Sequence, residues 1–290
     1  MPTRLLRRKA DSNKGDFGHI FILAGSAPFS GAAVLCSTSA MRSGSGLVTL
    51  GIPKGINNAI IKIKLPEVMT LPLAETKEGN ISVRAYKKIV NFVKKVDVVV
   101  IGPGLGKEES TQSLARKLIK KINKPMVIDA DGLNALAKHL ELLRVTNYRL
   151  PITRILTPHP GEMSRLCGKN IKEIQDKRET ISKKFAAAHK VTLVLKGYKT
   201  IVADFKNKLY INKTGNPGMS TAGCGDVLTG IIASFLGQKL DVFNAAKYAV
   251  YIHGLAGDLA AKEKSQLSLT ASDIIDKLPE AIMKSGLLPA

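Results

Sequence analysis

The sequence has no tryptophan, and only 5% of its 290 residues are aromatic. Aromatic platforms on which unpaired bases stack are therefore scarce, which argues against a nucleic-acid partner. Its three cysteines, Cys36, Cys167 and Cys224, lack metal-ligand spacing and are too few for a disulfide framework. No apolar run approaches the roughly 20 residues that a membrane helix needs, and no secretory stretch follows the basic N-terminal segment. These absences predict a cytoplasmic protein with neither nucleic acid nor membrane as a partner.

The chain does carry a large excess of positive charge. Its 44 lysine and arginine residues outnumber 23 aspartate and glutamate residues, which gives a net charge of +21. One interpretation is attraction to a polyanion, either nucleic acid or the pyrophosphate of a dinucleotide. The other is a lysine-rich surface that favours solubility. Because the lysines are spread along amphipathic segments and are not gathered in one block, the second interpretation is favoured.

Short apolar runs alternate with longer amphipathic segments. Near-continuous apolar runs are typical of strands in a parallel sheet that is covered on both faces. Such runs lie at 19–23, 47–50, 96–101, 126–128, 154–156 and 191–195. Helices are predicted between and after them, at 32–43, 110–121, 171–189, 227–236 and 242–262. Strand followed by helix, repeated along the chain, predicts a doubly wound α/β fold.

A different pattern appears at 200–205 and 208–211, two apolar runs separated by Lys206 and Asn207. This spacing predicts a hairpin that extends one edge of the sheet in the antiparallel sense. The segment 140–151 fits neither the strand nor the helix pattern. No linker, repeat or low-complexity segment divides the chain, so a single domain, 1–290, is predicted.

Several predicted strands are followed at once by glycine-rich or polar turns. In open α/β sheets, ligands bind beyond the carboxyl ends of the strands. One such turn is an ordinary turn device, but five on the same edge of one sheet indicate a binding site. They begin at Ala24, Gly102, Asp129, Thr157 and Lys196.

The strongest local signal is the segment NPGMSTAGCGD at 216–226, which leads directly into a predicted helix. The unpaired N–H groups of a first helical turn lie at the positive end of the helix dipole and bind anions. Gly223 and Gly225 lack the side chains that would keep an anion away. The segment therefore predicts a phosphate cradle. Asp226 is then either an ordinary first-turn carboxylate or the general base for a hydroxyl that attacks a phosphoryl group.

Four other polar residues keep two interpretations each. His159 lies between two prolines at the predicted ligand edge, although a lone histidine is more often structural. Glu162 either serves the same edge or caps the next helix. Asp129 and Asp131 either bind a metal or fix a loop, and the loop role is favoured for at least one of them.

Seven ordered stretches, from about residue 14 to 275, resemble the ADP- or ATP-dependent NAD(P)H-hydrate dehydratases. They are KGDFGHIFILAGS, SGAAVLCSTSAMRSGSGLV, IGPGLG, VIDADGLNAL, ILTPHPGEMSRL, LVLKGYKTIV and NKTGNPGMSTAGCGDVLTGI. The resemblance implies a ribokinase-like three-layer α/β/α sandwich, with a mostly parallel central sheet and an antiparallel edge extension, and a homotetramer.

The resemblance also implies an activity in metabolite repair. The substrate is the hydrated form of NADH or NADPH, which carries a hydroxyl on carbon 6 of the nicotinamide ring. The enzyme phosphorylates this hydroxyl from ADP or ATP, and the phosphate then leaves, which restores the ring double bond. ADP is the expected donor, and Mg²⁺ is expected with the donor phosphates.

Roles follow for individual residues of this chain. Asp226 takes the hydroxyl proton, while the amides of Gly223, Cys224 and Gly225 hold the transferring phosphate. The resemblance also implies two sets of ligand contacts. The donor nucleotide is contacted by Lys196, Gly197, Tyr198, Lys199, Thr200 and Gly225. The hydrated dinucleotide is contacted by Ala33, Gly104, Gly106, His159 and Asp226. No metal ligand is assigned.

Two departures from the family pattern stand out. The chain has Ala222 and Cys224 where the family usually has glycine and threonine in Gly-Gly-Thr-Gly-Asp. A thiol donates hydrogen bonds weakly, and at a helix N-terminus it is expected to be acidic and oxidisable. Some relatives also carry an N-terminal epimerase domain. Only a short arm precedes Lys14, so we expect a separate epimerase as functional partner.

Two other functions remain open at this point. A ribokinase-like kinase of a small vitamin-type alcohol would use the same helix start, and its product would keep the phosphate. A non-catalytic relative that binds nucleotides or nucleic acid is supported only by the net charge and by Cys224. The TPHPGE and GPGLG loops favour the dehydratase.

Overall fold

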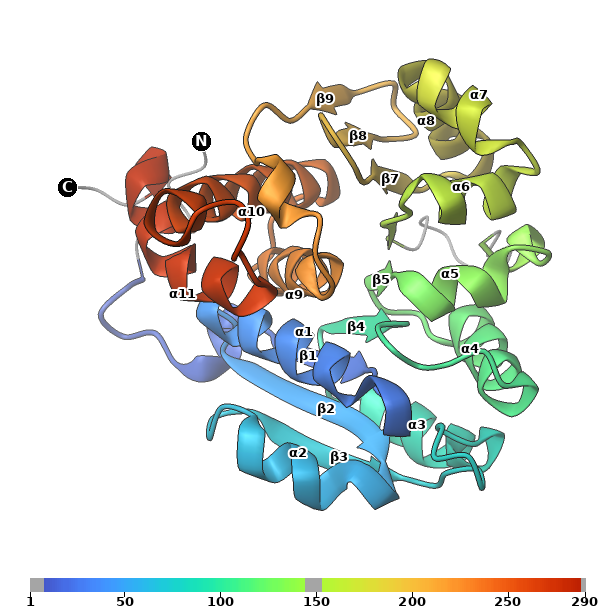
Figure 1. Ribbon diagram of the computed structural model, residues 1–290. Helices are drawn as coiled ribbons and strands as arrows, with labels where there is room; N and C mark the ends of the chain where they lie inside the picture. Colours follow the sequence, from blue (N-terminus) through green and yellow to red (C-terminus); the bar gives the residue numbers. More distant parts are fainter. Residues whose placement is uncertain (1–7, 144–152, 288–290) are drawn as a thin grey trace.

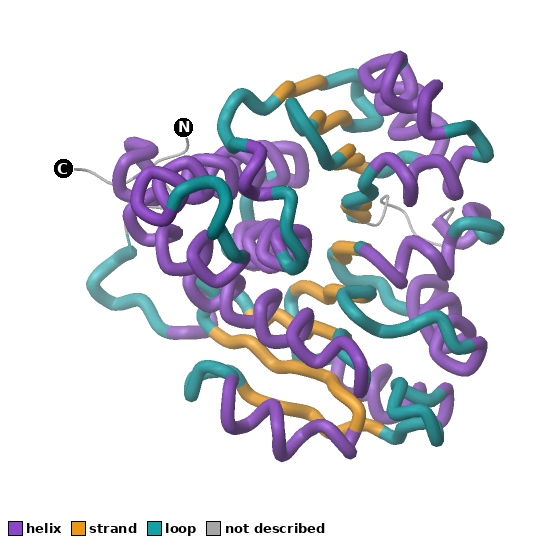
Figure 2. Tube along the Cα trace, in the orientation of Figure 1, coloured by secondary structure: helices purple, strands orange, loops and turns teal. Residues whose placement is uncertain are grey.

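A nine-stranded sheet forms the centre of the molecule, with helices on both of its faces (Figures 1 and 2). The computed structural model describes residues 8–143 and 153–287. The strands are β1 His19–Leu23, β2 Leu47–Pro53, β3 Met69–Leu73, β4 Val98–Ile101, β5 Met126–Ile128, β6 Arg154–Leu156, β7 Thr192–Leu195, β8 Ile201–Ala203 and β9 Leu209–Ile211. Most of segment 140–151, which had no predicted structure, lies outside the described residues, as do 1–7 of the basic arm.

The strand order is β3-β2-β1-β4-β5-β6-β7-β8-β9, and the first seven strands are parallel. Strands β8 and β9 run antiparallel at one end of the sheet, so the predicted hairpin extension is confirmed. Each predicted parallel strand is present within a few residues of its expected bounds. Because alternate side chains of a strand point to opposite faces, β1 buries Ile20 and Ile22 on one face and Phe21 and Leu23 on the other.

Two groups of helices cover these faces and produce the predicted three layers (Figure 1). The first face is covered by α1 Ser30–Arg42, α2 Asn57–Ile63, α9 Cys224–Gly237, α10 Val242–Lys264 and α11 Ala271–Ile282. The second is covered by α3 Tyr86–Val93, α4 Glu109–Lys121, α5 Ala130–Leu136, α6 Pro160–Cys167, α7 Ile171–Asp176 and α8 Arg178–His189. None of the described helices is both long and apolar enough to cross a membrane.

Several elements differ from the prediction. The helix expected over 171–189 is two helices, α7 and α8, because Lys177 leaves helical geometry at φ −124° and ψ 34°. Six elements were not predicted: β3, α2, α3, α5, α6 and α11. Strand β3 is an edge strand that contains Pro72, and α5 and α6 are only 7 and 8 residues long, so their patterns are weak.

The strand order reverses between β1 and β4, which pair with each other although β2 and β3 follow β1 in the chain. Such a switch point opens a crevice at the carboxyl ends of the strands. The loops after β1 and β4 meet there, since the N–H of Gly25 donates to the carbonyl of Pro103 at 2.8 Å. The fold therefore places the glycine-rich loops at one edge, as the sequence predicted.

Helix α9 is held at this edge by close contact with α1. A Cβ atom on Gly230 would lie 2.0 Å from Ser39 Oγ and 2.2 Å from the carbonyl oxygen of Cys36. Only glycine lets the two backbones approach this closely. The contact fixes where the first turn of α9 stands relative to the sheet.

We expect Gly230→Ala to lower the free energy of unfolding by about 1–3 kcal/mol, because the added methyl group overpacks the α1–α9 contact. Gly31→Ala is the matched control, since a Cβ at Gly31 meets nothing within 4 Å and alanine favours a helix. Urea unfolding followed by circular dichroism compares the two variants with the wild type. An equal stability for both variants would show that the contact does not constrain α9.

Candidate active site

Two cavities open at the carboxyl edge of the sheet and meet at shared residues. The larger, about 970 Å³, lies between the loop after β7, the loop before α9, and α10. The smaller, about 560 Å³, lies between the loops after β1 and β4, α5, and α6. Both are lined by Ala130, His159, Glu162 and Asp226. A group bound in one cavity can therefore reach a group bound in the other beside these four residues.

The first turn of α9 borders both cavities, and its geometry depends on Gly223. This residue precedes the helix with a left-handed φ of +88°, which glycine adopts without strain. A Cβ there would also lie 2.4 Å from Leu35 Cδ1. No side chain caps the helix, so its first N–H groups are left to the cavity. The arrangement suits the predicted phosphate cradle.

Asp226 is not a capping residue. Its carboxylate makes no hydrogen bond or ion pair with any described residue, although it lies in the first turn of α9. Burial raises its pKa to about 7, and the nearby negative charge of Asp129 adds to the rise, while Lys196 opposes it. A carboxylate with a pKa near neutrality and no protein partner is suited to accept a proton.

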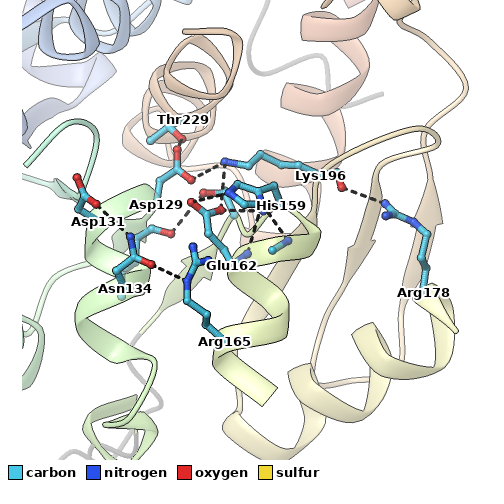
Figure 3. A network of polar contacts seen from close by, with 12 residues as sticks. Asp129, Asp131, Asn134, His159, Glu162, Arg165, Arg178, Lys196 and Thr229 are labelled. Atoms are coloured by element: carbon cyan, nitrogen blue, oxygen red, sulfur yellow. Dashed lines mark hydrogen bonds and ion pairs between the residues drawn. The ribbon is translucent and has the colours of Figure 1, made fainter. Parts of the chain in front are cut away.

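Lys196 lies at the centre of a group of carboxylates (Figure 3). Its Nζ is 2.7 Å from Asp129 Oδ1 and 3.8 Å from Glu162 Oε2. Burial opposes its charge, but Asp129 and Glu162 together raise the pKa of its ammonium group. Thr229 Oγ1 donates to the other oxygen of Asp129 at 2.7 Å. Asp129, which is 1% exposed, thus joins the end of β5 to the loop after β7 and to α9.

Both interpretations of His159 are realised in the structure. Its Nδ1 accepts from the N–H groups of Gly161 and Glu162 at 3.0 and 3.3 Å, and Glu162 Oε2 accepts from the His159 N–H at 2.8 Å. This reciprocal arrangement caps α6. The side chain is still 51% exposed and lines both cavities. Burial and the charge of Lys196 lower its pKa, so the ring is neutral at pH 7.

Asp131 has the loop role that the sequence favoured. Its Oδ2 accepts from the N–H of Gly106 at 2.8 Å, and Ser26 Oγ donates to the carbonyl of Gly104 at 2.8 Å. Gly104 has a φ of +61°, and a Cβ there would lie 2.8 Å from the carbonyl oxygen of Phe29. The glycines of this loop therefore let it pack against the loop after β1. Gly104 and Gly106 line the smaller cavity.

Nearly all of the predicted site residues come together. The larger cavity is lined by the expected residues Lys196, Gly197, Tyr198, Lys199, Thr200, Gly223, Cys224, Gly225 and Asp226. Ala33 is the one that lines neither cavity, because it is fully buried beneath the site, and its neighbour Ala32 lines the smaller cavity instead.

One wall of the larger cavity, formed by 212–215 and α10, was not predicted, although the segment that follows, 216–226, was predicted as the phosphate cradle. Asn212 Nδ2 donates to the carbonyls of Thr214 and Val250, and Asn216 Nδ2 donates to Asp258 Oδ1 at 3.0 Å. Gly254 packs so closely that a Cβ would lie 2.3 Å from Thr214 Oγ1. The turn residue Gly215 was the available signal, but nothing in the sequence indicated that α10 lies opposite it.

Comparisons with known proteins point to the same family that the sequence motifs resemble. A family model described as NAD(P)H-hydrate dehydratase matches residues 20–280. The chain is 43% identical over 277 residues to the bifunctional NAD(P)H-hydrate repair enzyme of Moorella thermoacetica, which is 96% of this chain and 51% of that protein. It is 38% identical over 253 residues to the ADP-dependent (S)-NAD(P)H-hydrate dehydratase of Neisseria meningitidis. This match covers 87% of this chain and 80% of that protein. The chain spans about half the length of the first curated relatives it matches.

A solved structure agrees with the fold as well. The ADP/ATP-dependent NAD(P)H-hydrate dehydratase from Bacillus subtilis, co-crystallised with ATP and Mg²⁺, is 33% identical with a TM-score of 0.81, and the match covers 97% of this chain and 95% of that one. The predicted ribokinase-like sandwich is therefore confirmed.

The prediction of an acidic thiol at Cys224 is wrong. The residue is 6% exposed, and burial raises the pKa of its thiol to about 11, although it begins α9. The cost of burying a thiolate thus outweighs the attraction of the helix N-terminus.

We expect iodoacetamide to modify Cys167 first, by at least about tenfold over Cys224, because only an accessible thiolate reacts. Cys167 is partly exposed, whereas Cys36 and Cys224 are buried. Peptide mapping by mass spectrometry after brief treatment at pH 8 measures the three rates. Protein unfolded in guanidinium is the control, in which all three should react alike. Preferential modification of Cys224 in folded protein would restore the idea of an activated thiol.

Proposed function

Because the chain belongs to the NAD(P)H-hydrate dehydratase family, we propose that it dehydrates the hydrated form of NADH or NADPH at the expense of ADP or ATP. The observation that carries this proposal is the position of Asp226. An unpartnered carboxylate with a pKa near 7 lies where two cavities meet, beside the free N–H groups of α9. Transfer of a phosphoryl group between two bound molecules requires such a meeting point.

The two cavities suit the two substrates. In the proposal, the larger one holds the donor nucleotide along the loop Lys196 to Thr200, where Tyr198 is 85% exposed and offers a face for stacking. The smaller one holds the hydrated dinucleotide beside Gly104, Gly106 and His159. Its volume of about 560 Å³ and its exposed rim suit a long ligand better than a small alcohol, which argues against the kinase alternative.

The reaction then follows from the residues around Asp226. Its carboxylate takes the proton of the ring hydroxyl as the oxygen attacks the terminal phosphorus of the donor. The bond from that phosphorus to the leaving nucleotide breaks, and the N–H groups of Gly223, Cys224 and Gly225 stabilise the charge on the transferring group. Phosphate next leaves the ring carbon and a ring proton is lost, so the double bond returns. Because backbone groups hold the phosphate, the step does not depend on a threonine hydroxyl at Cys224.

The proposal includes a Mg²⁺ ion bound to the donor phosphates. Asp129 and Glu162 line the larger cavity and are hard oxygen ligands of the kind that Mg²⁺ prefers. Asp129 is already held by Lys196 and Thr229, and Glu162 by the His159 N–H and by Lys196, so either carboxylate would only supplement the phosphates as a ligand of the ion. Across the described residues, no three His, Cys, Asp or Glu side chains are grouped to bind a metal. This donor set fits a Mg²⁺ that is held mainly by phosphates and whose charge offsets theirs.

Other expectations stay predictions. They are ADP as the donor, a single domain, a homotetramer, a cytoplasmic location, and a separate epimerase that supplies the epimer in use. The enzyme from Neisseria meningitidis is described as ADP-dependent, which supports ADP.

The first test is the recovery of absorbance at the NADH wavelength from NADH hydrate, with Mg²⁺ and either ADP or ATP. We expect recovery with ADP, and a loss of about 10²- to 10⁴-fold in rate for Asp226→Asn, because the general base is removed. This variant should stay folded, since it removes a buried charge, and Asp276→Asn at an exposed position of α11 is the matched control. The proposal fails if folded wild-type protein restores no NADH with either donor.

The pH dependence tests the role of Asp226 more directly. Because its pKa is about 7 and the base must be ionised, kcat/KM should fall as the pH falls through about 7. The charges that face it are Asp129, Asp131 and Glu162, which raise its pKa, and Lys196, which lowers it. Asp129→Asn should therefore move the acidic limb down by roughly one pH unit, and Lys196→Gln should move it up. If neither substitution moves the acidic limb, the limb reports the titration of a group other than Asp226.

A further inference from the structure

A chain of hydrogen bonds joins residues that line the smaller cavity and ends on an arginine that the proposed reaction does not use. The Gly106 N–H donates to Asp131 Oδ2 at 2.8 Å, and Asn134 Nδ2 donates to Asp131 Oδ1 at 3.0 Å. Asn134 Oδ1 then accepts from Arg165 Nε at 2.9 Å (Figure 3). These bonds link the loop after β4, helix α5 and helix α6.

The chain fixes the guanidinium and leaves its outer nitrogens available. Arg165 Nε is held by Asn134, but its Nη1 and Nη2 have no hydrogen-bond or ion-pair partner among residues 8–143 and 153–287. Arginine binds phosphate through two parallel N–H groups, and a guanidinium that is already oriented loses less entropy on binding. Arg165 is thus an oriented, unpaired cation at the wall of a cavity.

The charges of this cavity are distributed unevenly. Its carboxylates, Asp131, Glu162 and Asp226, include two that already bind protein groups. Its cations are Arg165 and Lys107, both exposed at the rim, whereas Asp226 is mostly buried. The guanidinium of Arg165 lies near the start of α6, since a Cβ on Gly161 would stand 3.9 Å from its Nη1. A ligand that lies in this cavity with its ring at Asp226 therefore meets the cationic side chains that line the cavity at its rim.

This distribution matches a molecule with a neutral ring at one end and phosphates beyond it. Resting on the proposed function, we propose that Arg165, with Lys107 beside it, binds the phosphates of the hydrated dinucleotide, and that Asn134 and Asp131 position the guanidinium. Lys196 cannot do this, because its ammonium is held by Asp129 and Glu162.

The test is steady-state kinetics of Arg165→Gln with both NADH hydrate and NADPH hydrate. Loss of a charge-assisted hydrogen bond should raise KM for the hydrate about 10- to 100-fold, with kcat changed by less than about threefold. KM for ADP should not change. Lys172→Gln on neighbouring α7 is the control, because it removes one positive charge from a side chain that is 86% exposed and lies outside both cavities.

The two substrates distinguish which phosphate is bound. An equal rise for both hydrates assigns Arg165 to the pyrophosphate, and a larger rise for NADPH hydrate assigns it to the additional ribose phosphate. An unchanged KM for both, or a rise in KM for ADP instead, overturns the proposal.

Asn134→Ala tests the positioning role. We expect it to raise KM for the hydrate in the wild type but not in the Arg165→Gln background, because its effect passes through the guanidinium. An equal effect in both backgrounds means that Asn134 acts through general structure. Arg165→Lys should retain the charge and lose the fork, and therefore give an intermediate KM.

A binding measurement separates this inference from the proposed function. NADH, the product, carries the same pyrophosphate and needs no turnover, so its dissociation constant can be measured by fluorescence for wild type and Arg165→Gln. If Arg165→Gln weakens NADH binding tenfold but the wild type never converts the hydrate, the phosphate site is supported and the dehydratase activity is disproved. If the wild type converts the hydrate but wild type and Arg165→Gln bind NADH equally well, the dehydratase activity is supported and the phosphate site is disproved.

Discussion

The buried ion pair between Lys196 and Asp129 is the interaction on which the rest of the site depends. It joins residues that are 67 positions apart in the chain, at the carboxyl ends of two strands separated by β6. Asp129 also holds α9 through Thr229, and Lys196 also faces Glu162 and Asp226. One cation thus offsets a cluster of carboxylates, and without it Asp129 would lose its ion pair while the neighbouring carboxylates repelled one another.

This electrostatic centre works only because packing brings α9 to it. Gly230 lets α9 approach α1, and Gly223 allows the chain to enter the helix in a left-handed conformation. Together they set the first turn of α9 over the end of β5, with Asp226 between the two cavities. The helix start therefore combines an apolar contact on one side with charged groups on the other.

Much of this arrangement could be predicted from the sequence. Apolar runs marked the strands, and glycine-rich turns after them marked the ligand edge, because parallel strands end together. Contacts between distant residues could not be predicted. The pairing of Lys196 with Asp129, the burial of Ala33, and the chain from Gly106 to Arg165 depend on tertiary packing. Cys224 shows the same limit, because the local helix start indicated an acidic thiol and burial reversed it.

The four residues shared by the two cavities have a consequence for the order of events. If donor and acceptor occupy neighbouring cavities, both must be bound before any bond breaks, and the phosphoryl group passes directly between them without a covalent enzyme intermediate. In such a scheme Asp226 accepts a proton and forms no bond to phosphorus. Initial-rate lines measured at several fixed concentrations of one substrate would then intersect, as in a ternary-complex mechanism, and would not run parallel as in ping-pong kinetics.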